Sequence, residues 1–133
     1  MATAPAAPSR LFIGVLSHAS PAALQKRNLQ RSLCNATGPY VTLRFVLGSR
    51  DVDADREDVL LLSTPHNDRL LGTYMLTNRL FRYALAQPDV AFVARADDDA
   101  LFDAGLIAHL LLRAASMPWA ASEHLVFGPF GEW

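Results

Sequence analysis

Four short apolar runs, separated by charged loops and helix-like segments, constrain the fold of this chain more than any other feature. They occupy residues 11–17, 40–48, 59–63 and 89–95, and runs of this length bounded by turn formers are typical of buried strands. The third run is continuously apolar, as in a parallel sheet that is covered on both faces. These runs predict the strands of a mostly parallel sheet.

Helical patterns fill the gaps between the strands. Ser20 and Pro21 form a helix start, with a hydroxyl N-cap followed by proline at the first helical position, and Asp103 is a candidate N-cap for a later helix. A fifth strand is expected at 124–130. The order β-α-β-β-α-β-α-β predicts an α/β layered domain with helices on both faces of the sheet. The predicted helices span 20–34, 68–86 and 103–115.

The exposed and buried faces of these helices follow from residue spacing. In the first helix, Leu29 and Leu33 share one face, whereas Arg27 and Arg31 lie on nearly the opposite face, which favours a basic, outward surface. In the second helix, one apolar stripe is expected from Leu70, Tyr74, Phe81 and Leu85. The charged segment 49–58 is expected to be a solvated loop.

Composition excludes several classes of function. Half of the 133 residues are apolar (51%), which argues against disorder, and the net charge of −1 gives no basic field for nucleic acid. Cys34 is the single cysteine, so an internal disulfide or an all-cysteine metal site is excluded. No apolar stretch approaches the ~20 residues of a membrane span. We therefore expect no membrane span in this chain.

Three consecutive aspartates, Asp97, Asp98 and Asp99, follow the fourth predicted strand. Ligands of open α/β sheets bind beyond the carboxyl ends of the strands. Successive side chains of an extended backbone point to opposite sides, so Asp97 and Asp99 can converge while Asp98 points away or back toward the protein. Two converging carboxylates form a hard anionic site that suits a divalent cation, which would complete its shell with water and phosphate oxygens. The alternative is a solvated acidic turn.

The acidic segment "FVARADDDALF" resembles the "(K/R)-x-D-D-D-x-F" signature of the β-1,3-galactosyltransferase-like glycosyltransferases, family 31 of the glycosyltransferases, which includes the Fringe relatives. Other segments are similar in the same order. "KRNLQRSLC" resembles the family's "R-R-x-x-I-R-x-T-W" helix, with Arg27 and Arg31 on its matching arginines, and "EDVLLLS" resembles "x-D-I-L-x-x-D". The resemblance covers residues 11–130, which correspond to the front half of a family domain.

The resemblance implies a GT-A-type, Rossmann-like fold and an inverting hexosyltransferase that uses a UDP-sugar donor and Mn²⁺ or Mg²⁺. By the family pattern, Asp99 is a direct metal ligand, and Asp97 and Asp98 contact the nucleotide sugar or the ion through water. Together with the convergence expected from the alternation of the strand, this makes Asp97 and Asp99 the expected metal ligands. Arg27 and Arg31 are expected near the nucleotide. The general base is expected beyond Trp133.

The same resemblance implies a glycan or glycoprotein acceptor and a location in the Golgi. Residues 1–9 are expected to be a flexible segment, and 10–133 the nucleotide-sugar-binding half of a longer glycosyltransferase domain. Two alternatives stay open. Tyr74 and Leu70 stand where the family has lysine and asparagine, which favours an inactive or incomplete nucleotide-sugar-binding fragment. A Mg²⁺-dependent phosphatase of the haloacid type needs an aspartate at the end of the first strand, where Ser17 and His18 stand.

Overall fold

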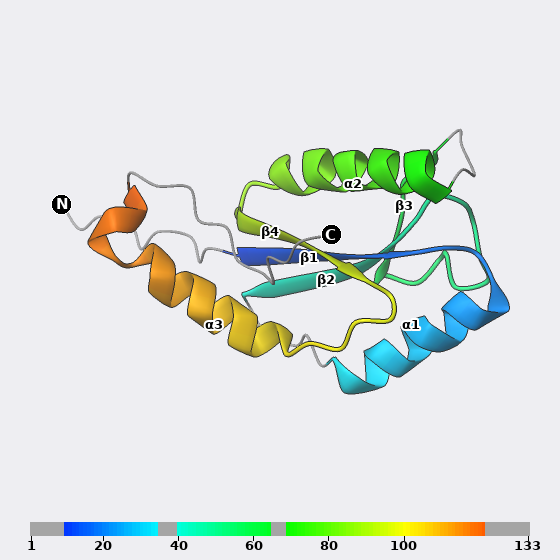
Figure 1. Ribbon diagram of the computed structural model, residues 1–133, viewed down its shortest axis with the longest axis horizontal. Coiled ribbons are helices and arrows are strands. Elements are labelled where there is room, and N and C mark those ends of the chain that lie inside the picture. Colours follow the sequence, from blue (N-terminus) through cyan, green and yellow to red (C-terminus); the bar gives the residue numbers. More distant parts are fainter. Residues whose placement is uncertain (1–9, 35–39, 65–68, 122–133) are drawn as a thin grey trace.

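A computed structural model describes residues 10–34, 40–64 and 69–121, which form an α/β domain (Figure 1). Its four strands are all parallel and lie in the order β3-β2-β1-β4. This arrangement confirms the predicted parallel sheet and is compatible with a Rossmann-like fold. The strands are β1 (Arg10–Ser17), β2 (Val41–Leu47), β3 (Val59–Leu61) and β4 (Val90–Asp97).

In the described part of the chain, three helices cover the sheet, and a short 3₁₀ turn follows the last of them at Pro118–Ala121. Helix α2 lies on one face of the sheet, and α1 and α3 lie on the other (Figure 1). The expectation of helices on both faces is therefore confirmed. The helices are α1 (Pro21–Leu33), α2 (Arg69–Leu85) and α3 (Ala104–Ala115).

Strand β1 lies at the centre of the sheet and has a helix layer on each side. Its side chains alternate: Leu11, Ile13 and Val15 pack toward α3, whereas Phe12 and Leu16 pack toward α2. The chain order reverses beside β1, because β2 and β3 extend on one side and β4 returns on the other. Such a reversal is where ligands bind in sheets of this kind.

Both predicted helix starts are confirmed. The Ser20 hydroxyl accepts a hydrogen bond from the backbone N–H of Ala23 at 3.1 Å, and the Asp103 carboxylate accepts one from the N–H of Leu106 at 2.9 Å. These bonds satisfy backbone donors that have no partner within the helix. The strand bounds differ slightly from the prediction: β3 ends at Leu61, and β4 continues to Asp97.

The predicted faces of α1 are wrong. Leu29 and Leu33 are 55% and 57% exposed, while Arg27 and Gln30 are buried. Apolar spacing alone favours burial of the two leucines. Arg27 is buried instead because Asp51 and Asp53, from another part of the chain, pair with its charge and offset the cost of removing it from water.

The predicted stripe of α2 is also wrong. Tyr74 and Leu85 are exposed, and the sheet is covered instead by Leu76, Leu80 and Ala84. These three residues recur every fourth position, which is an equally good helical stripe. Because α2 is apolar on several sides, its sequence does not single out the buried one.

Some expectations lie outside the described residues: the flexible segment 1–9, the strand at 124–130 and the side chain of Leu70. No helix in the described ranges combines the length and the apolar character that crossing a membrane requires.

Candidate functional site

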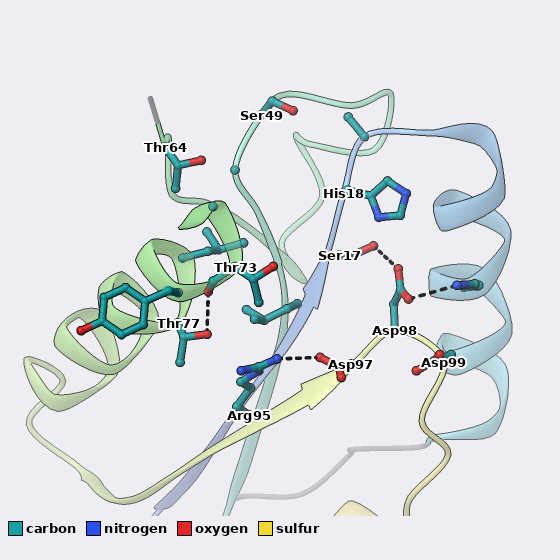
Figure 2. Close-up of a pocket in the computed structure, with 17 residues that line it drawn as sticks. Ser17, His18, Ser49, Thr64, Thr73, Thr77, Arg95, Asp97, Asp98 and Asp99 are labelled. Atoms are coloured by element: carbon teal, nitrogen blue, oxygen red, sulfur yellow. Dashed lines mark hydrogen bonds and ion pairs between the residues drawn. The ribbon is translucent and has the colours of Figure 1, made fainter. Parts of the chain in front are cut away.

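A cleft of about 1400 Å³ lies at the carboxyl ends of the strands (Figure 2). Its floor comes from the ends of β1, β2 and β4, and its walls come from α1 on one side and α2 on the other. The α2 wall bears the hydroxyls of Thr73 and Thr77, whereas the α1 wall bears Lys26. All three aspartates of the acidic segment line this cleft.

The end of β4 and the turn after it separate the aspartates: Asp97 is the last residue of the strand, and Asp98 and Asp99 lie in the turn. Val93 packs on the α2 side of the sheet, so Arg95 and Asp97, at even spacing from it, share that side. Asp98 points the other way, toward α1, and is only 9% exposed. Asp97 and Asp99 are exposed. The prediction that Asp98 turns back toward the protein is therefore confirmed.

The carboxylate of Asp98 has two partners from different elements. The Ser17 hydroxyl at the end of β1 donates a hydrogen bond to Oδ2 at 2.8 Å, and the Lys26 ammonium on α1 lies 3.4 Å from Oδ1 (Figure 2). Both oxygens of Asp98 thus contact groups of the protein. This aspartate joins β4 to β1 and α1.

Arg27 fixes the direction of the Ser17 hydroxyl. Its Nη1 donates to Ser17 Oγ at 2.9 Å and to the carbonyl oxygen of His18 at 2.9 Å. Because the Ser17 oxygen accepts from Arg27, its own proton is free to donate to Asp98. A chain of hydrogen bonds therefore runs from buried Arg27 through Ser17 to the edge of the cleft.

Arg27 itself is 0% exposed and is neutralised by the loop that follows β2. Its Nη2 lies 2.6 Å from Asp51 Oδ2 and 2.8 Å from Asp53 Oδ1, and its Nε donates to Asp53 Oδ2 at 3.0 Å. Burial would lower the pKa of Arg27, but its hydrogen bonds with Asp53 and Asp51 outweigh this effect and raise it. The hydrogen bond from Arg27 is the main reason that the pKa of Asp53 falls to about 2.

Arg31 lies one helical turn further along the same network. Its Nε contacts Asp58 at 2.7 Å, its Nη2 contacts Asp53 at 2.9 Å, and its guanidinium lies 4.7 Å from the centre of the Phe45 ring. Burial tends to raise the pKa of Asp58, but the hydrogen bond from Arg31 lowers it below its ordinary value. The two arginines and the loop carboxylates form one ionic cluster, made of Arg27, Arg31, Asp51, Asp53 and Asp58, of which Arg27 and Asp53 are buried and the others half-buried.

This ionic cluster corrects two expectations. Segment 49–58 is not simply a solvated loop, because Asp53 is buried and contacts both arginines. Arg27 and Arg31 do not line the cleft, and Arg27 has no exposed surface with which to contact a nucleotide. The physical reason is pairing: carboxylates close by in space satisfy the guanidinium donors that a phosphate would otherwise have taken.

Gln30 holds the turn that carries the aspartates. Its side-chain nitrogen donates to the carbonyl oxygens of Asp97 at 3.1 Å and Ala100 at 2.6 Å, and the Ala100 N–H closes the turn on Asp97 at 3.1 Å. Lys26 and Gln30 are four residues apart on one face of α1, so both reach the same turn. Sequence reasoning missed both residues, although this spacing was a usable signal.

The oxygens left for a metal ion are few. Asp97 Oδ1 contacts Arg95 Nη2 at 3.1 Å, and Asp98 is held by Ser17 and Lys26, which leaves the second oxygen of Asp97 and the carboxylate of Asp99. Across residues 10–34, 40–64 and 69–121, no group of three or more His, Cys, Asp or Glu side chains is arranged to hold a metal ion. The donors fit a hard divalent ion only if water and a ligand's phosphate oxygens supply most of its shell.

Comparisons of this chain with protein-family models, with curated proteins and with solved structures found no match. The functional argument therefore rests on the residues of the cleft.

Proposed function

We propose that this protein binds a UDP-sugar together with Mn²⁺ or Mg²⁺, as the donor-binding part of a glycosyltransferase that moves a hexose to an acceptor hydroxyl. The observation that carries the proposal is the position of Asp97 and Asp99. Both are exposed in a cleft at the carboxyl ends of β1 and β4, where the strand order reverses. The likeness of "FVARADDDALF" to a glycosyltransferase signature supplies the choice of ligand.

The charges of the cleft support a divalent ion. The three aspartates carry three negative charges, and Lys26 and Arg95 carry two positive charges, so these residues sum to −1. A divalent cation changes this sum to +1, which favours an anionic diphosphate. In a transfer reaction, the ion would neutralise the charge that develops on the departing diphosphate.

The residues of this chain would then have distinct roles. Asp97 and Asp99 would bind the ion, and the Gln30 side chain would hold their turn in place through the backbone oxygens of Asp97 and Ala100. The hydroxyls of Thr73 and Thr77 lie on the α2 wall. The Thr77 hydroxyl donates its proton to the Thr73 carbonyl oxygen at 2.8 Å, so its oxygen can accept a hydrogen bond from a sugar or ribose hydroxyl of the ligand.

Calorimetric titration of UDP in the presence and absence of Mn²⁺ tests the proposal. We expect UDP to bind only with the metal, and Asp99→Ala to weaken this binding at least about tenfold, because it removes a charged ligand of the ion. Glu57→Ala is the matched control, since Glu57 is an exposed acid outside the cleft and its loss changes the net charge equally. Metal-independent binding that Asp99→Ala leaves unchanged would contradict the proposal.

Binding without catalysis is the second candidate. One carboxylate of the acidic segment, Asp98, is tied to Ser17 and Lys26, so it is not free to act as a base. Release of free hexose from UDP-galactose and UDP-glucose in the presence of Mn²⁺ separates the two candidates. An enzyme releases hexose at a rate that falls in Asp99→Ala, whereas a binding protein releases none while still binding UDP.

A further inference from the structure

The positive charges that face the cleft differ from those that the sequence motif suggested. Arg27 and Arg31 belong to the ionic cluster and do not line the cleft, so an anion in the cleft does not contact them. Lys26 and Arg95 line the cleft instead. Arg95 is paired with Asp97 at 3.1 Å, whereas Lys26 has 45% of its side chain exposed and a longer contact, 3.4 Å, with Asp98. Lys26 is the single lysine of the sequence. Histidines aside, every other basic residue is an arginine.

The contact between Lys26 and Asp98 is loose. The separation of 3.4 Å is long for a charged hydrogen bond, and an ammonium group has three donors, of which Asp98 occupies one. Asp98 also accepts the shorter hydrogen bond from Ser17, which stabilises its negative charge without Lys26. Lys26 thus keeps donors that can turn toward a ligand in the cleft.

We propose that Lys26 is the residue that binds the phosphate groups of an anionic ligand, and that Ser17 and Asp98 position its ammonium at the cleft. This inference rests on the proposed function and adds a ligand-binding group to the metal-binding aspartates. Asp98 acts here as a positioning residue and not as a ligand of the ion. The order of contacts is Arg27 to Ser17, Ser17 to Asp98, and Asp98 to Lys26.

The chemistry of the two kinds of basic residue supports this assignment. A lysine ammonium is a compact charge on a flexible stem, and it can leave one partner for another at little cost. The Arg27 guanidinium, in contrast, is held in a fixed geometry by Asp51 and Asp53. The chain therefore has a rigid cation for structure and an adaptable cation at the cleft, one residue apart on α1.

The test measures UDP affinity by calorimetry in Mn²⁺ for Lys26→Met, which keeps the apolar stem and removes the charge. We expect about tenfold weaker binding, since a charged hydrogen bond to phosphate is lost. Lys26→Arg is expected to keep most of the affinity because it restores a positive charge. Arg79→Met is the matched control, since Arg79 is an exposed cation on α2 that does not line the cleft.

Salt dependence separates a contact with the ligand from a merely structural role. The UDP affinity of the unaltered protein should fall as NaCl rises, and the fall should be shallower in Lys26→Met because one screened charge pair is missing. Ser17→Ala, checked for folding by circular dichroism, should weaken UDP binding about threefold through the lost hydrogen bond to Asp98.

Pyrophosphate with Mg²⁺ is the second probe, and it keeps this inference distinct from the proposed function. Pyrophosphate binding that depends on Lys26, without UDP binding, would support the inference and contradict the nucleotide-sugar proposal. UDP binding that is equal in Lys26→Met and the unaltered protein would overturn the inference and leave the proposed function standing. Failure of both ligands to bind would overturn both.

Discussion

Helices α1 and α2 cover opposite faces of one sheet, but they contact it with different side chains. Helix α2 packs with Leu76, Leu80 and Ala84 against apolar strand residues. Helix α1 instead directs buried Arg27 and Gln30, together with half-buried Arg31, toward loops and strand ends. The α2 side is a close-packed apolar contact, whereas the α1 side is a network of charges and hydrogen bonds.

The comparison shows how the cleft obtains fixed walls. Apolar packing along α2 depends on shape and holds the helix against the strands. The polar contacts of α1 depend on direction, and they hold three separate segments together: the end of β1, the loop 49–58 and the acidic turn after β4. A site that needs carboxylates at defined positions gains from directional contacts. The α1 network supplies them to the acidic turn, through the side chain of Asp98 and the backbone oxygens of Asp97 and Ala100.

The largest effect is expected for Arg27→Met. This change leaves Asp51 and Asp53 without their main cation in a buried position, so we expect a loss of about 4 kcal/mol in the free energy of unfolding. Urea denaturation measures it. Adding Asp53→Asn to Arg27→Met should recover part of the loss, because the unpaired charge is then removed. A loss below about 1 kcal/mol would show that the ionic cluster contributes little.

A slightly smaller effect is expected on the apolar side for Leu80→Ala. Leu80 is fully buried, and its loss should cost about 3 kcal/mol through the cavity that it leaves. Gly14 lies beneath it: a Cβ at Gly14 would clash with the Leu80 side chain. Gly14→Ala should therefore destabilise the unaltered protein but stabilise the Leu80→Ala variant, where space is available. Urea denaturation of the two single variants and the double variant measures this coupling, and additive effects would contradict the packing described.

The smallest of these effects, and the one that depends on pH, is expected for Asp53→Asn. A fall in pKa from the ordinary 3.8 to about 2 in the folded state means that the ionised carboxylate stabilises the protein. Its contribution, about 2 kcal/mol at neutral pH, is present above pH 3.8 and is lost as the pH falls toward 2. The stability difference between the unaltered protein and Asp53→Asn should shrink over that range.

Leu80→Ala is the control for this pH dependence, because it carries no titrating group. Its stability deficit should stay constant over the same pH range. Equal pH dependence in Leu80→Ala and Asp53→Asn would show that Asp53 is not the group that makes the α1 side sensitive to acid.

The sequence predicted the parts of this fold that depend on local patterns. The strand and helix order, the caps at Ser20 and Asp103 and the position of the aspartates at a strand end follow from neighbouring residues. The inward face of α1 did not, because the burial of Arg27 depends on Asp51 and Asp53, which lie more than twenty residues away. Long-range charge pairing outweighed the apolar spacing of Leu29 and Leu33.

The candidate site was likewise predictable only in part. Asp98 points inward, as one of the two predicted directions, although it lies in the turn just after β4 and not in an extended strand. Its partners Ser17 and Lys26 were not predicted, since they come from β1 and α1 and meet Asp98 only through the strand order. With the order β2-β1-β4 known, the pairing of Leu16 with Asp97 in the sheet would have placed Ser17 beside Asp98.

The most direct test of the central claim is paramagnetic broadening of backbone amide signals by Mn²⁺ in the presence of UDP. We expect the signals of 97–99 and of Ser17 and His18 to broaden first, because a bound ion would lie at the cleft. The signals of 112–115 in the last turn of α3, at the other end of the sheet (Figure 1), should persist. Broadening confined to the acids of loop 49–58, or no selective broadening, would contradict a metal and nucleotide site at the acidic turn.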